Sequence, residues 1–186
     1  MTEVMTVANI LTLIRLVLIP VFALLTVEEK LSTAIVVFVI AAITDLLDGL
    51  TARYLHQSTS LGRILDPVAD KVMLVTAFVI LTLPGHTYRP IPLWLTVIVI
   101  SRDLFIVLGA AAIFLTTNFR EFRPSLPGKV STCIQFLTVT VVLAANTWGL
   151  FLDQLRWLYG VTFAVTLFSG IHYIAHAARL VESARH

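Results

Sequence analysis

Residues 31–83 of the chain read LSTAIVVFVIAAITDLLDGLTARYLHQSTSLGRILDPVADKVMLVTAFVILTL. A long apolar run stands at each end of this stretch, with the short polar segment 56–60 between them. Four aspartates flank that segment: Asp45, Asp48, Asp66 and Asp70. A run of about 20 apolar residues is long enough to cross a bilayer as a helix. The stretch therefore predicts two membrane helices joined by a tight loop, with acidic residues near their shared end.

The composition of the whole chain indicates that lipid is its solvent. Of 186 residues, 58% are hydrophobic and 13% are charged, whereas soluble domains have about 25% charged residues. The mean hydropathy is +0.94. At about 20 residues a span, this length allows about six or seven spans and leaves no room for a separate soluble domain. We expect residues 1–186 to form a single membrane domain, without a nucleic-acid partner.

Six apolar runs follow one another, separated by brief polar segments. They cover Val7 to Val27, Leu31 to Leu55, Leu61 to Leu83, Ile91 to Thr116, Pro127 to Asn146 and Leu155 to Leu180. The predicted fold class is therefore all-α, a polytopic membrane protein with six transmembrane helices in one bundle.

The distribution of basic and aromatic residues predicts how the helices are oriented. Six spans place both termini on one side of the membrane, together with the second and fourth loops. That side holds Arg53, Arg63, Lys71, Arg120, Arg123, Lys129, Arg179 and Arg185. The opposite side holds Lys30, Arg89 and Arg156, with the aromatic residues Tyr88, Trp94, Trp148, Trp157 and Tyr159. Basic loops stay in the cytoplasm and aromatic belts lie at interfaces, so both termini are expected in the cytoplasm.

The aspartates of the second and third spans are functional candidates, because a carboxylate at membrane depth is costly unless it is paired, hydrated or bound to a metal. Asp45 and Asp48 are three residues apart, and the second pair is four apart. Each pair therefore projects from one helix face. Four converging carboxylates suit Mg²⁺ or Mn²⁺, with two ions expected. We expect these groups to line a polar cavity that opens to the cytoplasm.

Small residues and a guanidinium accompany the two acidic pairs. Gly49 and Gly62 remove side chains where a ligand can approach the backbone, and Ala52 keeps the same face open. Arg53 lies about 80° around the helix from Asp45, so it can face the same cavity and neutralise a phosphate. Together these residues suggest a substrate that carries a phosphate ester or a pyrophosphate.

Residues 45–70 match the pattern DxxDGxxARx8GxxxDxxxD at each of its eight fixed positions. This pattern resembles the signature of the CDP-alcohol phosphatidyltransferase family, and the resemblance extends to the size of the chain and its six-span layout. Members of that family condense a CDP-linked lipid or alcohol with a hydroxyl-bearing acceptor and release CMP, and they commonly form dimers. The resemblance implies a homodimeric enzyme of phospholipid synthesis, expected in a bacterial inner membrane with its active site facing the cytoplasm.

The resemblance also implies roles for individual residues. Asp45, Asp48, Asp66 and Asp70 would hold two metal ions that bind the CDP pyrophosphate, and Asp70 would be the catalytic base that deprotonates the acceptor hydroxyl. Gly49, Ala52, Arg53 and Gly62 would line the CDP-lipid site. Asn9, Thr12 and Arg15 match an NxxTxxR pattern that opens the first helix of phosphatidylglycerophosphate and cardiolipin synthases in the family. We expect Asn9 and Thr12 near the CDP-lipid and Arg15 near the acceptor.

The identity of the acceptor is predicted from three shorter segments. LDPVADK at 65–71 resembles the phosphatidylglycerophosphate synthase and eukaryotic-type cardiolipin synthase branch, which favours CDP-diacylglycerol as donor and glycerol 3-phosphate as acceptor. However, SRDLFIVLGAA at 101–111 lacks the second arginine common in phosphatidylglycerophosphate synthases. That segment and GKVSTCIQ at 128–135 resemble the cardiolipin synthases, so phosphatidylglycerol is the alternative acceptor.

An acceptor that carries a phosphate needs basic residues, and Arg102, Arg120, Arg123 and Lys129 are candidates. Structural roles are also open. Arg102 and Asp103 can form a pair that lets a polar segment survive in the bundle, and Arg120 and Arg123 can belong to a solvated loop at the headgroups. A rival class is an ion-coupled transporter, but the internal repeats and broken helices typical of transporters are not seen in the sequence.

Overall fold

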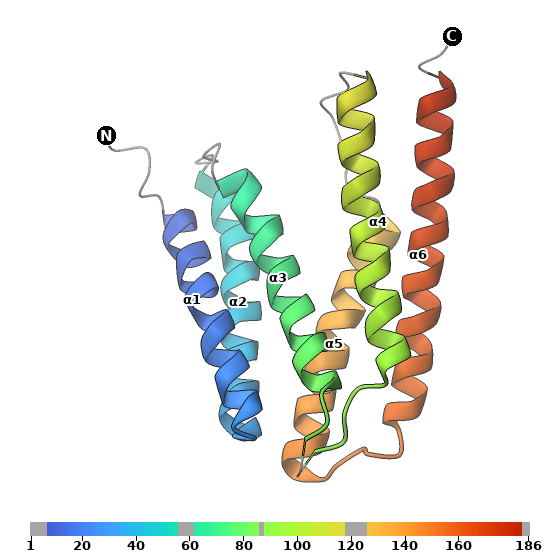
Figure 1. The fold of residues 1–186 in the computed structure, drawn as a ribbon. Coiled ribbons are helices and arrows are strands. Elements are labelled where there is room, and N and C mark those ends of the chain that lie inside the picture. The colour runs from blue at the N-terminus through green and yellow to red at the C-terminus, as the bar shows by residue number, and fades with distance from the viewer. Residues whose placement is uncertain (1–6, 56–61, 86–87, 118–125, 184–186) are drawn as a thin grey trace. The chain divides into compact units, whose positions relative to one another are not determined.

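The computed structural model describes the backbone of residues 7–55, 62–85, 88–117 and 126–183, and the side chains of residues 12–44, 71–85, 88–109 and 126–175. Within these ranges every regular element is an α-helix (Figure 1). The helices are α1 (Val7–Val27), α2 (Leu31–Leu55), α3 (Gly62–Thr82), α4 (Leu93–Thr117), α5 (Leu126–Trp148) and α6 (Leu155–Ser183). The predicted all-α class is confirmed, and each predicted apolar run corresponds to one helix.

The helix bounds lie close to the predicted ones. α1 and α2 begin and end at the predicted residues, whereas α4 begins at Leu93 instead of Ile91. The later start has a simple cause, because a residue that precedes a proline is disfavoured in the helical conformation, and Ile91 precedes Pro92. The Pro92 carbonyl instead accepts the first hydrogen bonds of α4, from the backbone N–H groups of Leu95 and Thr96.

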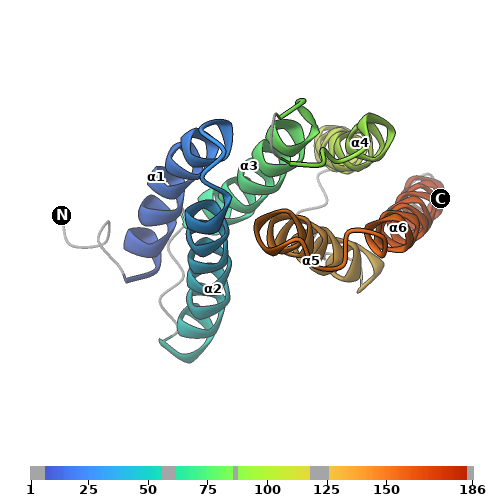
Figure 2. The same ribbon diagram turned by 90° about the horizontal axis from the view of Figure 1, so that it is seen from below.

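The helices form two compact units. Unit 1 comprises residues 1–91 and 139–152, and in it α1 packs against both α2 and α3 (Figure 2). The rings of Phe22 and Phe38 meet with their centroids 5.4 Å apart. Ala34 and Ala77 are fully buried, and such small side chains let helices approach closely.

The turn between α1 and α2 is closed by backbone hydrogen bonds. Glu29 N–H donates to the Thr26 carbonyl and Lys30 N–H donates to the Leu25 carbonyl, which is the pairing of a Schellman motif. Glu29 takes the left-handed conformation of that motif with φ of 58°. Three residues thus suffice to reverse the chain, and α2 runs antiparallel to α1 (Figure 1).

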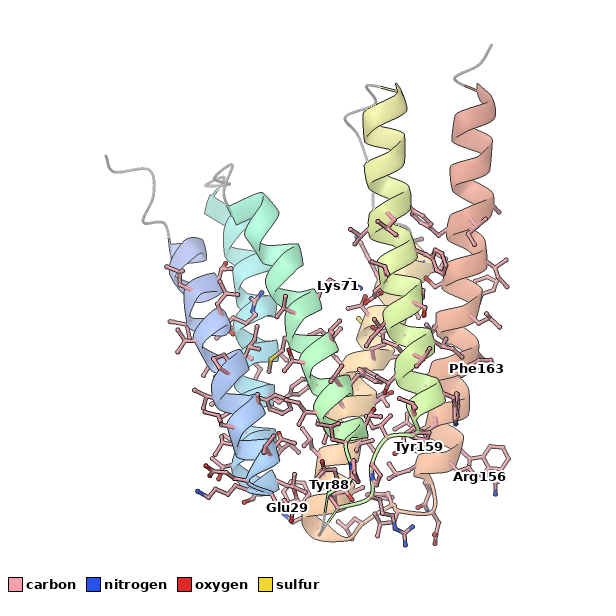
Figure 3. The ribbon with its side chains drawn as sticks, in the orientation of Figure 1. Glu29, Lys71, Tyr88, Arg156, Tyr159 and Phe163 are labelled. Carbon is pink, nitrogen blue, oxygen red and sulfur yellow. The ribbon has the colours of Figure 1, made fainter. Side chains whose placement is uncertain are left out.

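The segment after α3 folds back on the end of that helix. Tyr88 OH donates to the carbonyls of Leu83 at 3.0 Å and Ile80 at 3.3 Å. Ile80 lies in the last turn of α3, and Leu83 directly follows the helix. Gly85 is required here, because a Cβ atom at this position would collide with the Tyr88 ring. Burial raises the pKa of the Tyr88 hydroxyl above its ordinary value, and the carboxylate of Glu29 at the same end of unit 1 adds to the effect (Figure 3).

Unit 2 comprises residues 92–138 and 153–186, and in it α4 packs along α6. The two helices run parallel (Figure 1). Arg102 contacts Ser169 and Tyr173 contacts Ile106, and both hydrogen bonds join residues 67 positions apart in the chain. Gly109 allows this close packing, because a Cβ atom there would lie 3.0 Å from the Tyr173 ring.

The outward faces of the helices are strongly apolar. On α6, Trp157, Phe168 and Ile174 each expose more than 60% of their surface. In the part of the chain that the structure describes, two helical segments are long and apolar enough to cross a membrane, Leu126–Trp148 and Leu155–Ala175. The further prediction of six spans around one polar cavity stays a prediction, as does the single domain.

Candidate functional site

The two halves of the acidic motif lie at the same end of unit 1. α2 ends at Leu55 and α3 begins at Gly62. Figure 1 shows these two ends on the same side of unit 1, so the chain runs antiparallel along the two helices. Asp45 and Asp48 belong to the last three turns of α2, and Asp66 and Asp70 to the first three turns of α3. The helical backbone keeps each pair on one face of its helix, because their spacings are three and four residues.

The side chains of the four aspartates lie outside the described ones, as do those of Gly49, Ala52, Arg53 and Gly62, whose backbones are helical. The metal geometry thus stays a prediction. Among the described side chains, no other group of three or more His, Cys, Asp or Glu residues is placed to hold a metal ion.

On α1, the predicted site residues Thr12 and Arg15 face the interior of unit 1. Each is only 1% exposed. Asn9 lies one turn earlier on the helix, and its side chain is outside the described ones. Thr12 and Arg15 share a buried stripe with Ile19, Phe22 and Thr26, which recur at three- and four-residue intervals. A buried arginine in an apolar helix is a candidate for function, because the charge costs stability unless the protein uses it.

Of the predicted acceptor-binding residues in unit 2, Arg102 is the one that the structure buries. Its side chain is 7% exposed, and Asp103 beside it is 5% exposed. Arg102 Nη1 donates to Asp103 Oδ1 at 2.6 Å, and Nη2 donates to Ser169 Oγ at 2.5 Å. Lys129 is exposed in the first turn of α5, and Arg120 and Arg123 lie outside the described residues.

A line of buried polar residues on α6 was not predicted from the sequence: Thr162, Thr166, Ser169 and Tyr173. Thr162 shares a hydrogen bond with Thr138 at 2.7 Å, and Thr166 lies 3.4 Å from Ser131, oxygen to oxygen. Gln135 Nε2 donates to the same Ser131 hydroxyl at 3.3 Å. The alternating intervals of four and three residues on α6 were the available signal, because they place all four side chains on one face.

Unit 2 therefore has hydroxyl groups between its helices and apolar side chains on its outer surface. Hydroxyl and amide groups commonly join helices within a bilayer, where lipid offers them no hydrogen bonds. In water the apolar side chains would instead be buried between the helices, and the polar groups would lie on the surface. The fold and its polar groups define the class of protein: an all-helical membrane protein with an acidic motif divided between two antiparallel helices, near the ends that lie on the same side of unit 1.

Comparison with known proteins identifies the family. The model of the CDP-alcohol phosphatidyltransferase family matches residues 5–178, which is nearly the whole chain. The chain belongs to the CDP-alcohol phosphatidyltransferase family. The resemblance drawn from residues 45–70 is thus confirmed.

The chain is similar to proteins of two named activities. It is 33% identical over 201 residues to the human cardiolipin synthase (CMP-forming), covering 95% of this chain and 64% of the human protein. It is 31% identical to a probable phosphatidylglycerophosphate synthase of Mycobacterium tuberculosis strain H37Rv, covering 96% of this chain and 84% of that one. It is 34% identical to the CDP-diacylglycerol–glycerol-3-phosphate 3-phosphatidyltransferase of Aquifex aeolicus, covering 88% of each. The chain therefore spans somewhat less than two thirds of the human relative.

Proposed function

We propose that the protein is an enzyme of phospholipid synthesis that transfers a phosphatidyl group from CDP-diacylglycerol to glycerol 3-phosphate, giving phosphatidylglycerophosphate and CMP. The observation that carries the proposal is the complete acidic motif of residues 45–70, whose four aspartates belong to two antiparallel helices, α2 and α3, near the ends that lie on the same side of unit 1. The family match over residues 5–178 supports it. A transporter is disfavoured, because the motif belongs to a family defined by group transfer.

The donor set of the motif suits magnesium. Asp45, Asp48, Asp66 and Asp70 are hard oxygen ligands on two helices, and their number is that expected for two Mg²⁺ or Mn²⁺ ions. Bound ions would neutralise the pyrophosphate of the CDP-lipid and stabilise CMP as it leaves. The four carboxylates in turn need cations, because like charges brought together in a membrane site repel one another.

Asp70 is proposed as the general base. It accepts the proton of the acceptor hydroxyl as the hydroxyl oxygen attacks the β-phosphorus of the CDP-lipid. A new phosphorus–oxygen bond then joins the acceptor to the phosphatidyl group. At the same time the β-phosphorus loses its bond to the oxygen that bridges the two phosphorus atoms of the pyrophosphate. CMP leaves with the electron pair of that bond. Asp70 near cations would be ionised at neutral pH, as a base must be.

The remaining candidates divide between the two substrates. Gly49, Ala52, Arg53 and Gly62 are proposed to line the CDP-lipid site, with Asn9 and Thr12 of α1. Arg15, Arg102, Arg120, Arg123 and Lys129 are proposed to serve the acceptor. The burial of Arg15 and Arg102 supports a functional role for these two residues, because ionisable groups buried in membrane helices generally serve a site.

Phosphatidylglycerol is the second candidate acceptor, which would make the protein a cardiolipin synthase. The similarity to human cardiolipin synthase favours it, and so does the segment after Arg102, which has no further arginine before Arg120. Glycerol 3-phosphate is kept as the first candidate because similar proteins of M. tuberculosis and A. aeolicus are named for that branch.

We further propose that all six helices cross a bacterial inner membrane as one bundle, with both termini and the acidic motif on the cytoplasmic side, and that the enzyme works as a homodimer. The distribution of Arg and Lys supports this orientation. The apolar outer faces of the helices support their contact with lipid.

The proposal is tested by measuring CMP release from CDP-diacylglycerol by the purified protein, with glycerol 3-phosphate and phosphatidylglycerol as separate acceptors. We expect release with glycerol 3-phosphate, its loss with EDTA and its return with Mg²⁺ or Mn²⁺. Release with phosphatidylglycerol alone would make the protein a cardiolipin synthase. No release with either acceptor would overturn the proposed reaction.

A further inference from the structure

The guanidinium of Arg102 is held in one orientation by two other buried residues of unit 2. Nη1 donates to Asp103 Oδ1 and Nη2 donates to Ser169 Oγ. Ser169 is fully buried. An arginine side chain normally loses substantial rotamer freedom when it binds a ligand, so holding it in advance reduces that loss.

Further hydrogen-bond donors remain in this arrangement, among them Arg102 Nε–H and the hydroxyl proton of Ser169. Arg102 Nε–H is buried and has no hydrogen-bond acceptor among the described residues. Ser169 accepts a hydrogen bond from Arg102 through its oxygen, which leaves its own proton available to donate. A buried donor without an acceptor is costly. The pair is therefore suited to a ligand that supplies oxygen acceptors, and a phosphate oxyanion is the group that arginine binds best.

The packing of α4 on α6 sets the distance between these two residues. One turn beyond Arg102 and Ser169, Tyr173 OH donates to the Ile106 carbonyl at 3.0 Å. Both bonds connect the helices in the same parallel register. The packing of α4 against α6 therefore places Ser169 next to Arg102, and both residues belong to helices.

We propose that Ser169 is a positioning residue that holds Arg102 to bind the phosphate group of the acceptor. The inference rests on the proposed function, because it gives Arg102 its ligand. The phosphate belongs to glycerol 3-phosphate or to phosphatidylglycerol, and both present the same oxyanion chemistry to the guanidinium. A purely structural role would instead make the Arg102–Asp103–Ser169 cluster a means of joining α4 to α6.

The experiment compares Ser169→Ala, Ser169→Thr and Thr166→Val with the wild type in CMP release and in thermal unfolding. Thr166→Val is the matched control, because Thr166 is a buried hydroxyl on the same face of α6 with Ser131 as its neighbour. We expect Ser169→Ala to raise the KM for the acceptor about tenfold, since a hydrogen bond to a charged group is lost. The KM for CDP-diacylglycerol should not change, and Ser169→Thr should keep most of the affinity.

Binding is measured separately from turnover, by the rise in Tm that glycerol 3-phosphate or short-chain phosphatidylglycerol causes in each variant. We expect one of these acceptors to raise the Tm of the wild type and of Thr166→Val, and to have little effect on Ser169→Ala. Equal acceptor affinities in Ser169→Ala and the wild type would overturn the inference, as would the absence of any acceptor-dependent rise in the wild type. Binding without CMP release would instead overturn the proposed reaction and leave the positioning role of Ser169 supported.

Discussion

The side-chain oxygens of Thr138 and Thr162 lie 2.7 Å apart where α5 contacts α6. Both side chains are fully buried, and each hydroxyl also lies within reach of a carbonyl of its own helix, Ile134 for Thr138 and Leu158 for Thr162. Because a hydroxyl has a single proton, one threonine donates to the other, and the accepting threonine donates to its own helix carbonyl. A hydrogen bond between helices is useful in lipid, because the surrounding solvent does not compete for it. This contact therefore offers a direct test of how unit 2 is held together.

Replacing Thr138 and Thr162 by Val, singly and together, should reveal a coupling free energy of about 0.5–1.5 kcal/mol. Valine keeps the shape of threonine and removes the hydroxyl, so the cycle measures the interaction between the two hydroxyls. Reversible unfolding in mixed micelles provides the four free energies. Strictly additive losses would show that the two hydroxyls do not stabilise the contact.

Gly85→Ala should destabilise unit 1 by about 1–3 kcal/mol, the usual cost of overpacking. The new Cβ atom would overlap the Tyr88 ring. The loss should disappear in a Tyr88→Ala background, where the ring is absent. Gly160→Ala is the control, because no atom lies within 4 Å of a Cβ atom placed there. Equal losses at positions 85 and 160 in thermal unfolding would contradict the steric explanation.

Tyr88→Phe should lower the free energy of unfolding by about 1 kcal/mol at neutral pH, because two carbonyls at the end of α3 lose a donor. The pKa of Tyr88 is raised in the folded state from 10.0, so the folded protein holds the phenolic proton more tightly than the unfolded chain does. The stabilisation is therefore complete below pH 10 and is lost as the pH rises through the raised pKa. Wild type and Tyr88→Phe should converge in stability above pH 10, and a constant difference would contradict this account.

Asp70→Asn should abolish CMP release while much of the affinity for the CDP-lipid remains, because the amide cannot accept the proton of the acceptor hydroxyl. Asp48→Ala should weaken metal and nucleotide binding together. Asp153→Asn is the matched control, because Asp153 is an exposed aspartate in the turn between α5 and α6. Turnover by Asp70→Asn at the rate of the wild type would exclude Asp70 as the base.

The orientation of the chain can be tested by labelling single cysteines in intact cells with a membrane-impermeant maleimide. Cys133 is the only cysteine of the chain, so Cys133→Ala provides the background. Asp153→Cys, on the less basic side, should be labelled from outside, whereas Thr2→Cys should react only after permeabilisation. The opposite pattern would show that the termini and the acidic motif face away from the cytoplasm.

Much of the candidate site was predictable because its signal is local. The eight fixed residues of the motif stand at set intervals within 45–70, and a helix converts such intervals into shared faces. The short segment 56–60 made antiparallel helices the expected arrangement, and the structure has them (Figure 1). Arg102 was found by its charge alone, since an arginine in an apolar run is conspicuous.

The partners of Arg102 were predictable only in part. Asp103 is its neighbour in the chain, and a pair between them was one of the two interpretations considered. Ser169 lies 67 residues away in the chain. Nothing in the sequence distinguishes it from the other hydroxyl residues in the apolar helices. The same is true of Thr138 and Thr162, since hydroxyl residues are inexpensive in membrane helices and carry no strong signal.

The sequence by itself determined the helices that the structure describes, their bounds to within a few residues, and the family. Apolar length and motif spacing are properties of a continuous stretch of chain. The tertiary structure alone decided which polar side chains meet: Arg102 with Ser169, Thr138 with Thr162, and Tyr88 with the end of α3. In a chain whose helices are apolar on most faces, hydrophobic periodicity does not specify which helices pack together. The hydrogen bonds between helices follow from that packing, because they form only where two polar groups are brought within reach.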